Sequence, residues 1–190
     1  MLRSCRQVHF TNNIVIILAK RLISFQSGKT SIANFLSESL NIEESVTPRP
    51  TQGVRIVEFG LNDVNINDKT TNVDIELWDS SGDHRFESCW PAIRSGTQGV
   101  ILICSPNNAL TASREMELLY NYFVSQPKLT GKQSVVFYNC SEEQDEINNL
   151  NLSSTFSKVS QVKVNITTGG NRLKIDFSNF ISSILQSINK

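Results

Sequence analysis

The chain has 190 residues, 39% of them hydrophobic and 19% charged, and its formal net charge is zero. This length and this apolar content are enough for one folded domain with a sizeable core. A neutral chain lacks the basic surplus with which general nucleic-acid binders neutralise phosphates, so we do not expect a nucleic acid as a partner.

Cysteine pairs and long apolar runs, the usual marks of metal centres and membrane spans, are missing from the sequence. The four cysteines form no C-x-x-C pair, which argues against a metal or redox centre and favours reduced thiols in a cytoplasmic protein. The longest apolar run, 14–19, is far shorter than the roughly 18 residues of a membrane span. The final residues, LQSINK, carry no prenylation box and residue 2 is not glycine, so we expect no direct membrane anchor.

The first half of the chain alternates apolar runs with polar, proline-containing connections. In chain order we expect a strand at 13–19, a helix at 31–40, a loop at 41–53, a strand at 54–59, a polar turn region at 60–72 and a strand at 73–79. The last two strands together predict a hairpin.

The second half continues this alternation and ends in an amphipathic helix. We expect a strand at 99–105, a helix at 111–125, a strand at 134–139, a polar loop or short helix at 141–154, a strand at 161–167 and a helix at 171–189. Alternating strands and helices predict an α/β fold, here a three-layer sandwich with a mainly parallel six-stranded sheet.

A Gly28-Lys29-Thr30 tripeptide lies between the first expected strand and the first helix, where a phosphate-binding loop would lie. Gly28 would let the backbone approach a phosphate, and the start of the helix offers free N–H groups. Lys29 would reach the β- and γ-phosphates, and the Thr30 hydroxyl would bind Mg²⁺. The full pattern, G-x-x-x-x-G-K-[ST], has a glycine where this chain has Ile23, and the tripeptide alone also arises by chance.

Two further pieces of such a site follow in the sequence. Asp79 ends an expected strand, where a parallel sheet presents its carboxyl ends to a ligand, and its carboxylate can hold Mg²⁺ through water. The Gly82 N–H could contact a γ-phosphate, and Thr51 could close from its loop onto the metal. Each piece alone is also typical of an ordinary turn, but in this order they together predict a nucleotide site.

Four segments resemble the Rab-like small GTPases of the Ras superfamily, and most closely the Rab-like subunit family of the intraflagellar transport B complex. They are SGKTSIANFLSES, TQGVRIVEF, ELWDSSGDHRFESCWPAI and REMELLYNYFVSQP, and the Trp-Pro within FESCWPA is the most specific feature. The resemblance covers residues 27–139 well. It implies a small-GTPase-like G domain that binds GTP or GDP with Mg²⁺ and assembles with coiled-coil subunits of that complex. It also implies a role in cilium assembly, in the cytoplasm, the cilium and the ciliary base.

The same resemblance implies a set of site residues. For the nucleotide they are Gln26, Ser27, Gly28, Lys29, Thr30, Ser31, Thr51, Gly82, Asn139 and Glu142. For the metal they are Thr30, Thr51 and, through water, Asp79.

Three positions depart from the family pattern. Asp83 follows Gly82 where an active GTPase has a glutamine that orients the attacking water, and a γ-phosphate repels a carboxylate, so we expect slow or absent hydrolysis. The base-reading motif Asn-Lys-x-Asp is replaced by NCSE at 139–142, which leaves guanine selectivity open. Thr167 and Thr168 stand in the last loop in place of the usual Ser-Ala-Lys.

Other interpretations of the same residues stay open. A nucleotide-free pseudo-GTPase scaffold in the same complex would fit Ile23 and the altered base motif. A conventional Rab-type membrane switch is disfavoured by Asp83 and by the missing lipidation cysteine. His84 is expected to face solvent. Phe86 and Trp90 either form a partner surface or pack under the adjacent helix.

The segment before Ser27 is basic, with no acidic residue before Glu38. This composition resembles a mitochondrial transit peptide, although here the basic stretch runs directly into the phosphate loop. A solvated extension and a wrongly chosen first exon are the alternatives, and the abrupt onset of family similarity at Ser27 favours the second. We therefore expect a doubtful N-terminal segment at 1–26, which includes the first strand, and a single G-like domain at 13–190.

Overall fold

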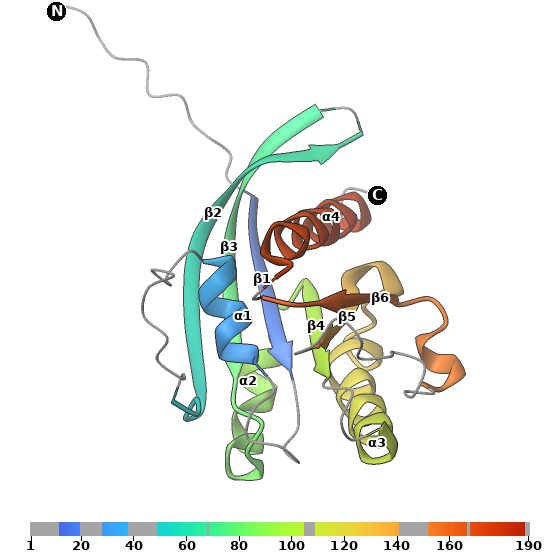
Figure 1. Ribbon diagram of the computed structural model, residues 1–190. Helices are drawn as coiled ribbons and strands as arrows, with labels where there is room; N and C mark the ends of the chain where they lie inside the picture. The colour runs from blue at the N-terminus through green and yellow to red at the C-terminus, as the bar shows by residue number, and fades with distance from the viewer. Residues whose placement is uncertain are drawn as a thin grey trace, which may run out of the picture.

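The computed structural model describes residues 12–19, 28–37, 49–67, 69–104, 109–140, 152–166 and 168–188. Within these residues, six strands form one sheet, and its order is β2-β3-β1-β4-β5-β6. Only the β2–β3 pair is antiparallel, so the expected α/β fold with a mainly parallel six-stranded sheet is confirmed (Figure 1).

The strands and helices follow one another in the alternating order that the sequence predicts. The strands are β1 Asn12–Ala19, β2 Val54–Ile66, β3 Lys69–Ser80, β4 Gly99–Cys104, β5 Ser134–Asn139 and β6 Ser160–Val164. The helices are α1 Lys29–Leu36, α2 Trp90–Arg94, α3 Ala109–Tyr120 and α4 Gly170–Ile188. A π-helical turn, Asn121–Ser125, continues α3, and short 3₁₀ helices lie at His84–Cys89, Gly131–Gln133 and Ser154–Phe156.

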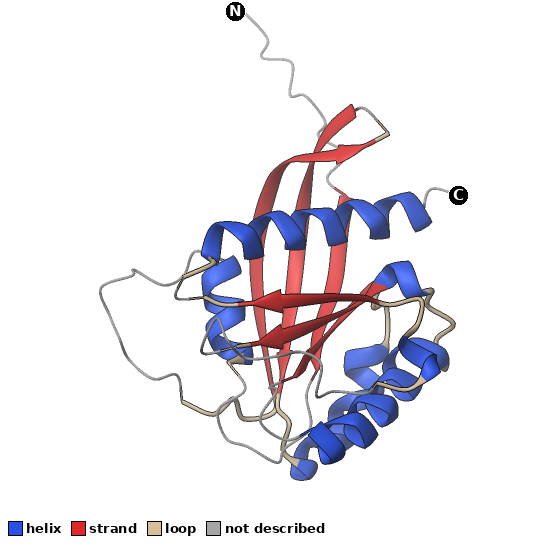
Figure 2. Ribbon diagram, turned by 45° about the vertical axis from the view of Figure 1, so that its right-hand side comes forward, coloured by secondary structure: helices blue, strands red, loops and turns tan. Residues whose placement is uncertain are grey.

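Helices cover both faces of the sheet, and the alternation of side chains along β1 shows why (Figure 2). Successive residues of a strand point to opposite faces. Ile14, Ile16 and Leu18 are buried in the cluster formed with α1 and α4, whereas Ile17 and Ala19 are buried in the cluster formed with α2 and α3. The sheet is therefore the middle layer of three, as expected.

The β2–β3 hairpin is longer than the sequence predicts. Residues 60–72 were expected to be a polar turn region, and this expectation is wrong, because both strands continue almost to the tip at Asn67. Their polar residues alternate with apolar ones that face α4, among them the fully buried Val64. Ser182 of α4 donates a hydrogen bond to the carbonyl of Asn65, and the Phe59 and Phe177 rings lie 6.1 Å apart. Packing against α4 thus holds the hairpin extension in place.

The other element boundaries differ from expectation by a few residues. The helix expected to reach residue 40 ends at Leu36, and 38–40 lie outside the described residues. The strand expected at 161–167 ends at Val164, because Asn165 turns the chain by accepting hydrogen bonds from Thr168 and Gly169. Most of the polar stretch expected at 141–154 also lies outside the described part of the chain.

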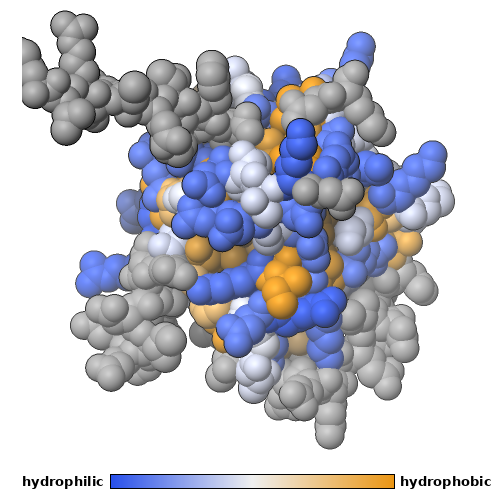
Figure 3. All heavy atoms as spheres, turned by 90° about the horizontal axis from the view of Figure 1, so that it is seen from above, coloured by the Kyte–Doolittle hydropathy of each residue, from blue (hydrophilic) through white to orange (hydrophobic). Residues whose placement is uncertain are grey.

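The described surface mixes hydrophilic and hydrophobic residues on the face seen from above (Figure 3). Its large exposed hydrophobic residues are spread over β2, α3 and α4 rather than gathered on one element. They are Ile56, Leu118, Ile175 and Ile188. Among the described helices, none combines the length and the apolar composition that crossing a membrane takes.

Candidate nucleotide and metal site

The start of α1 carries the phosphate-loop residues that the structure describes. Gly28 precedes the helix with φ at 73°, a left-handed conformation that favours glycine, and its carbonyl accepts from the Ile32 N–H at 2.8 Å. A Cβ added to Gly28 would lie only 2.2 Å from Nδ2 of Asn139, which ends β5. The structure therefore brings together Gly28 and Asn139, two residues predicted for the same site from distant parts of the sequence.

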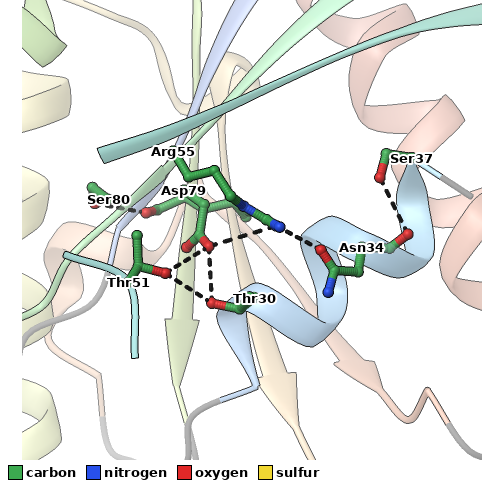
Figure 4. Close-up of polar contacts among 8 residues, drawn as sticks. Thr30, Asn34, Ser37, Thr51, Arg55, Asp79 and Ser80 are labelled. Carbon is green, nitrogen blue, oxygen red and sulfur yellow. Dashed lines mark hydrogen bonds and ion pairs between the residues drawn. The ribbon is translucent and has the colours of Figure 1, made fainter. Parts of the chain in front are cut away.

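Three predicted metal residues converge beside this loop (Figure 4). The Thr30 hydroxyl donates to Oδ2 of Asp79 at 2.8 Å, and the Thr51 hydroxyl donates to the same oxygen at 3.0 Å. The two hydroxyl oxygens are themselves 3.0 Å apart. One residue comes from the start of α1, one from the loop before β2 and one from the end of β3, so the sheet edge joins all three predicted pieces.

The donor set of this cluster fits Mg²⁺. Magnesium binds oxygen ligands and is usually held by one or two carboxylates together with phosphates and water. Asp79 is completely buried, and its Oδ1 has no hydrogen-bond partner within the described residues. Buried polar atoms are rarely left unpaired, so this oxygen marks a position where an ion or its bound water would complete the site.

One backbone hydrogen bond and one side-chain hydrogen bond fix the chain on either side of Asp79. The Ser81 N–H donates to the Gly53 carbonyl at 2.7 Å, which ties the end of β3 to the loop that carries Thr51. The Ser80 hydroxyl donates to the Leu18 carbonyl on β1 at 2.8 Å. Gly82 follows directly and is buried at the same edge of the sheet.

Asp83, the residue that stands where an active GTPase has glutamine, is held by its own neighbour. Its carboxylate accepts from Arg85 three times, from the backbone N–H at 3.0 Å, from Nε at 2.9 Å and from Nη2 at 2.6 Å. The side-chain hydrogen bonds from Arg85, and next its backbone N–H, hold the pKa of Asp83 below its usual range. The carboxylate is thus ionised and turned into the 3₁₀ helix that follows, a pairing that the sequence analysis did not include.

The two aromatic residues and the histidine of this segment fall into different environments. Trp90 is buried, with its ring 5.2 Å from Tyr122 and 5.3 Å from Phe123, so of its two expected arrangements packing under the helix is the one found. Phe86 is half-buried. His84 has a side chain 57% exposed and lies 2.6 Å from a Glu87 oxygen, so it faces solvent as expected.

The base-reading positions are only partly described. Cys140 is buried in the core under α3, and its N–H donates to the Val164 carbonyl, so its thiol belongs to the core. Thr168 lies in the turn before α4, where its N–H donates to Oδ1 of Asn165. Lys29 and Ser31 are half-buried in the first turn of α1. The remaining predicted positions, Gln26, Ser27, Glu142 and Thr167, lie outside the described residues.

Besides Arg85, sequence reasoning missed Arg55 and Asn34, which the structure places at this site. Arg55 of β2 reaches toward Asp79, with 3.8 Å between Nη2 and Oδ2, and donates from Nη2 to Oδ1 of Asn34 on α1 at 2.6 Å. The available signal was the alternation within VRIVEF, which sets Arg55 on the same strand face as Val57 and Phe59. A charged residue on that inward face is unusual and could have been assigned to a site.

Comparison with known proteins agrees with this geometry. Residues 24–145 match the family described as Ras of Complex, Roc, domain of DAPkinase. The chain is 37% identical over 166 residues to the human intraflagellar transport protein 22 homolog and 36% identical to that of Macaca fascicularis, in each case covering 87% of this chain and 88% of the relative. A solved structure from T. brucei, described as IFT22/74/81 GTP-bound, has the same fold, with a TM-score of 0.69 and 20% identity over 93% of this chain and 97% of the other. The chain therefore belongs to the family of intraflagellar transport protein 22 homologs and carries the Ras-like domain of that family.

Proposed function

We propose that this chain binds GTP or GDP together with Mg²⁺ and works as a GTP-binding subunit of the intraflagellar transport B complex. The observation that carries the proposal is the convergence of Thr30, Thr51 and Asp79 on one point, with a buried Asp79 oxygen left without a partner in the described structure. Family membership supports it, because the matching domain is Ras-like.

The residues divide into phosphate, metal and base groups. Gly28, Lys29 and Ser31, with Gln26 and Ser27 before them, would surround the phosphates through backbone N–H groups and the Lys29 ammonium. Thr30 and Thr51 would offer their hydroxyl oxygens to Mg²⁺, which neutralises phosphate charge when it is bound, and Asp79 would hold it through water. Gly82 would contact a γ-phosphate. Asn139 and Glu142 would face the base.

Hydrolysis is proposed to be slow or absent. A GTPase needs a group that orients the attacking water, and a glutamine usually provides it. Here that position is Asp83, whose carboxylate Arg85 already engages in three hydrogen bonds. The chain would therefore act through the partner proteins that its nucleotide-bound form recruits.

The proposed partners are the coiled-coil subunits of the transport complex, in the cilium and at its base. Support comes from the T. brucei neighbour, whose description names IFT22 together with IFT74 and IFT81. Co-purification with the corresponding subunits of the same organism, followed by identification of any bound nucleotide, tests this part of the proposal.

A titration with a fluorescent GTP analogue in the presence of Mg²⁺ tests nucleotide binding directly. We expect saturable binding to the wild-type chain and at least tenfold weaker binding after Lys29→Ala, because the ammonium–phosphate contact is charge-assisted. Lys69→Ala is the matched control, since it removes an equal charge from an exposed position at the hairpin tip. Absence of binding by the wild-type chain would refute the nucleotide proposal and leave the scaffold interpretation.

A further inference from the structure

Arg55 forms an ion pair with Asp79 of the candidate metal site. Residues Arg55 and Asp79 are direct cross-strand neighbours in the β2–β3 register. Cross-strand neighbours share one face of a sheet, and here that face is the one covered by α1. The side chain runs across the site toward α1, as the close-up view shows (Figure 4). The strand register therefore gives Arg55 its place beside Asp79.

The contact between Arg55 and Asp79 is a charge interaction rather than a hydrogen bond. Nη2 lies 3.8 Å from Oδ2, beyond hydrogen-bond distance, while the same nitrogen donates to Asn34 at 2.6 Å. Oδ2 already accepts from both threonine hydroxyls. The guanidinium is thus anchored to α1 and supplies positive potential to a carboxylate that it does not directly bind.

Two buried polar atoms of this pair have no hydrogen-bond partner in the part of the chain that is described. They are Arg55 Nε, a donor, and Asp79 Oδ1, an acceptor. An ion pair made only for stability would normally satisfy such atoms, because leaving them unpaired is costly. The two unpaired atoms therefore indicate that a ligand binds between or beside Arg55 and Asp79.

We propose that Arg55 is a positioning residue that stands in partly for Mg²⁺ at Asp79. The proposal rests on the nucleotide-binding function proposed above. When the metal is absent, the guanidinium offsets the negative charge of Asp79 and reduces its repulsion of the nucleotide phosphates. The same positive charge also opposes the binding of Mg²⁺ itself beside Asp79. Nucleotide retention by this chain is therefore less dependent on Mg²⁺ than it would be without Arg55.

The size of the effect follows from distance and exposure. Two unit charges about 4 Å apart interact strongly even near a protein surface, but the Arg55 side chain is 40% exposed, so solvent screens much of the interaction. We expect a change of roughly fivefold when the charge is removed.

The experiment measures the dissociation rate of fluorescent GDP from the full chain, in excess Mg²⁺ and in EDTA. For Arg55→Gln, which removes the charge but keeps a polar side chain, we expect the ratio of the EDTA rate to the Mg²⁺ rate to rise about fivefold over wild type. The Mg²⁺ concentration that gives half of the slowing should fall in parallel. Arg55→Lys keeps the charge and should restore most of the wild-type ratio. Arg114→Gln, on the exposed side of α3, is the control for loss of one positive charge.

Each alternative result has a definite meaning. An unchanged ratio in Arg55→Gln, with normal nucleotide binding, would overturn the inference and leave the proposed function intact. Equal acceleration with and without metal would overturn it as well, because it would indicate direct contact of Arg55 with a phosphate or a purely structural role. Failure of the wild-type chain to bind any guanine nucleotide would refute the proposed function, and this inference with it.

Discussion

Replacing Gly28 by alanine is expected to destabilise the chain more than a glycine-to-alanine change normally does. Two costs combine at this position. The backbone has φ at 73°, which costs a residue with a Cβ about 1–2 kcal/mol. The new methyl group would also lie 2.2 Å from Nδ2 and 3.2 Å from Cγ of Asn139, so that side chain must move. Overpacking of this kind typically costs about 1–3 kcal/mol more.

Gly96 offers a matched control for the first cost alone. Its φ is 77°, and nothing lies within 4 Å of an added Cβ. Gly96→Ala should therefore show the backbone cost without the clash, and any gain from a less flexible unfolded chain is common to both variants. The difference between Gly28→Ala and Gly96→Ala, about 1–3 kcal/mol, measures the close approach of Asn139 to the loop.

Urea denaturation of the nucleotide-free chain, followed by circular dichroism, measures these unfolding free energies. Repeating Gly28→Ala in an Asn139→Ala background completes a double-mutant cycle. Without the Asn139 side chain, the cost of Gly28→Ala should fall to that of Gly96→Ala. Equal costs for the two glycine variants in the wild-type background would refute the reasoning, since they would mean that Asn139 does not crowd the loop.

Three further predictions concern the core, the pH response and the Asp83–Arg85 pair. Phe177→Ala should lower the free energy of unfolding by about 3–5 kcal/mol with an unchanged m-value in urea, because the ring is buried between α4 and the hairpin. Burial raises the pKa of Tyr138 from 10.0 to about 12, so between these values only the unfolded chain releases the proton, and stability should fall as pH rises through this window. Tyr138→Phe has no phenol to titrate, so it should remove that part of the pH dependence in denaturation curves measured from about pH 9 to pH 12. Arg85→Ala should lower the affinity for GTP relative to GDP by about twofold at low salt, because the uncompensated charge of Asp83 would repel the γ-phosphate. An unchanged ratio of the two affinities in competition titrations would count against this view.

Much of the fold was predictable because its signals are local. The apolar runs at β4 and β5 are bounded by polar residues, and both strands are fully or almost fully buried, as a central parallel strand must be. The hairpin extension was missed because its residues are mostly polar, and strand formation there depends on a partner strand and on α4. Tertiary packing decided an element that local propensity could not.

The candidate site, too, was predictable only where its signals are local. Thr30 and Asp79 could be assigned from the sequence because each stands within a short motif next to an expected strand or helix. The hydrogen bonds between Asp83 and Arg85 could not, since they depend on the local turn into the 3₁₀ helix.

The origin of residues 1–26 stays a prediction, which transcript sequencing across the junction before Ser27 would test. A continuous, abundant message there would contradict the exon hypothesis.

The place of Arg55 depends on a single irregularity in the hairpin. Near the tip, Val64 pairs with Thr71, but the register shifts between Leu61 and Val64, where Asp63 takes a left-handed conformation with φ at 56°. If the register of the tip continued unchanged, Asp79 would stand opposite Ile56 instead of Arg55. A slip of one residue in a strand reverses the face on which each side chain lies, so the bulge brings the cation to the carboxylate. No glycine marks this position, and the sequence alone therefore gave no reason to pair Arg55 with Asp79.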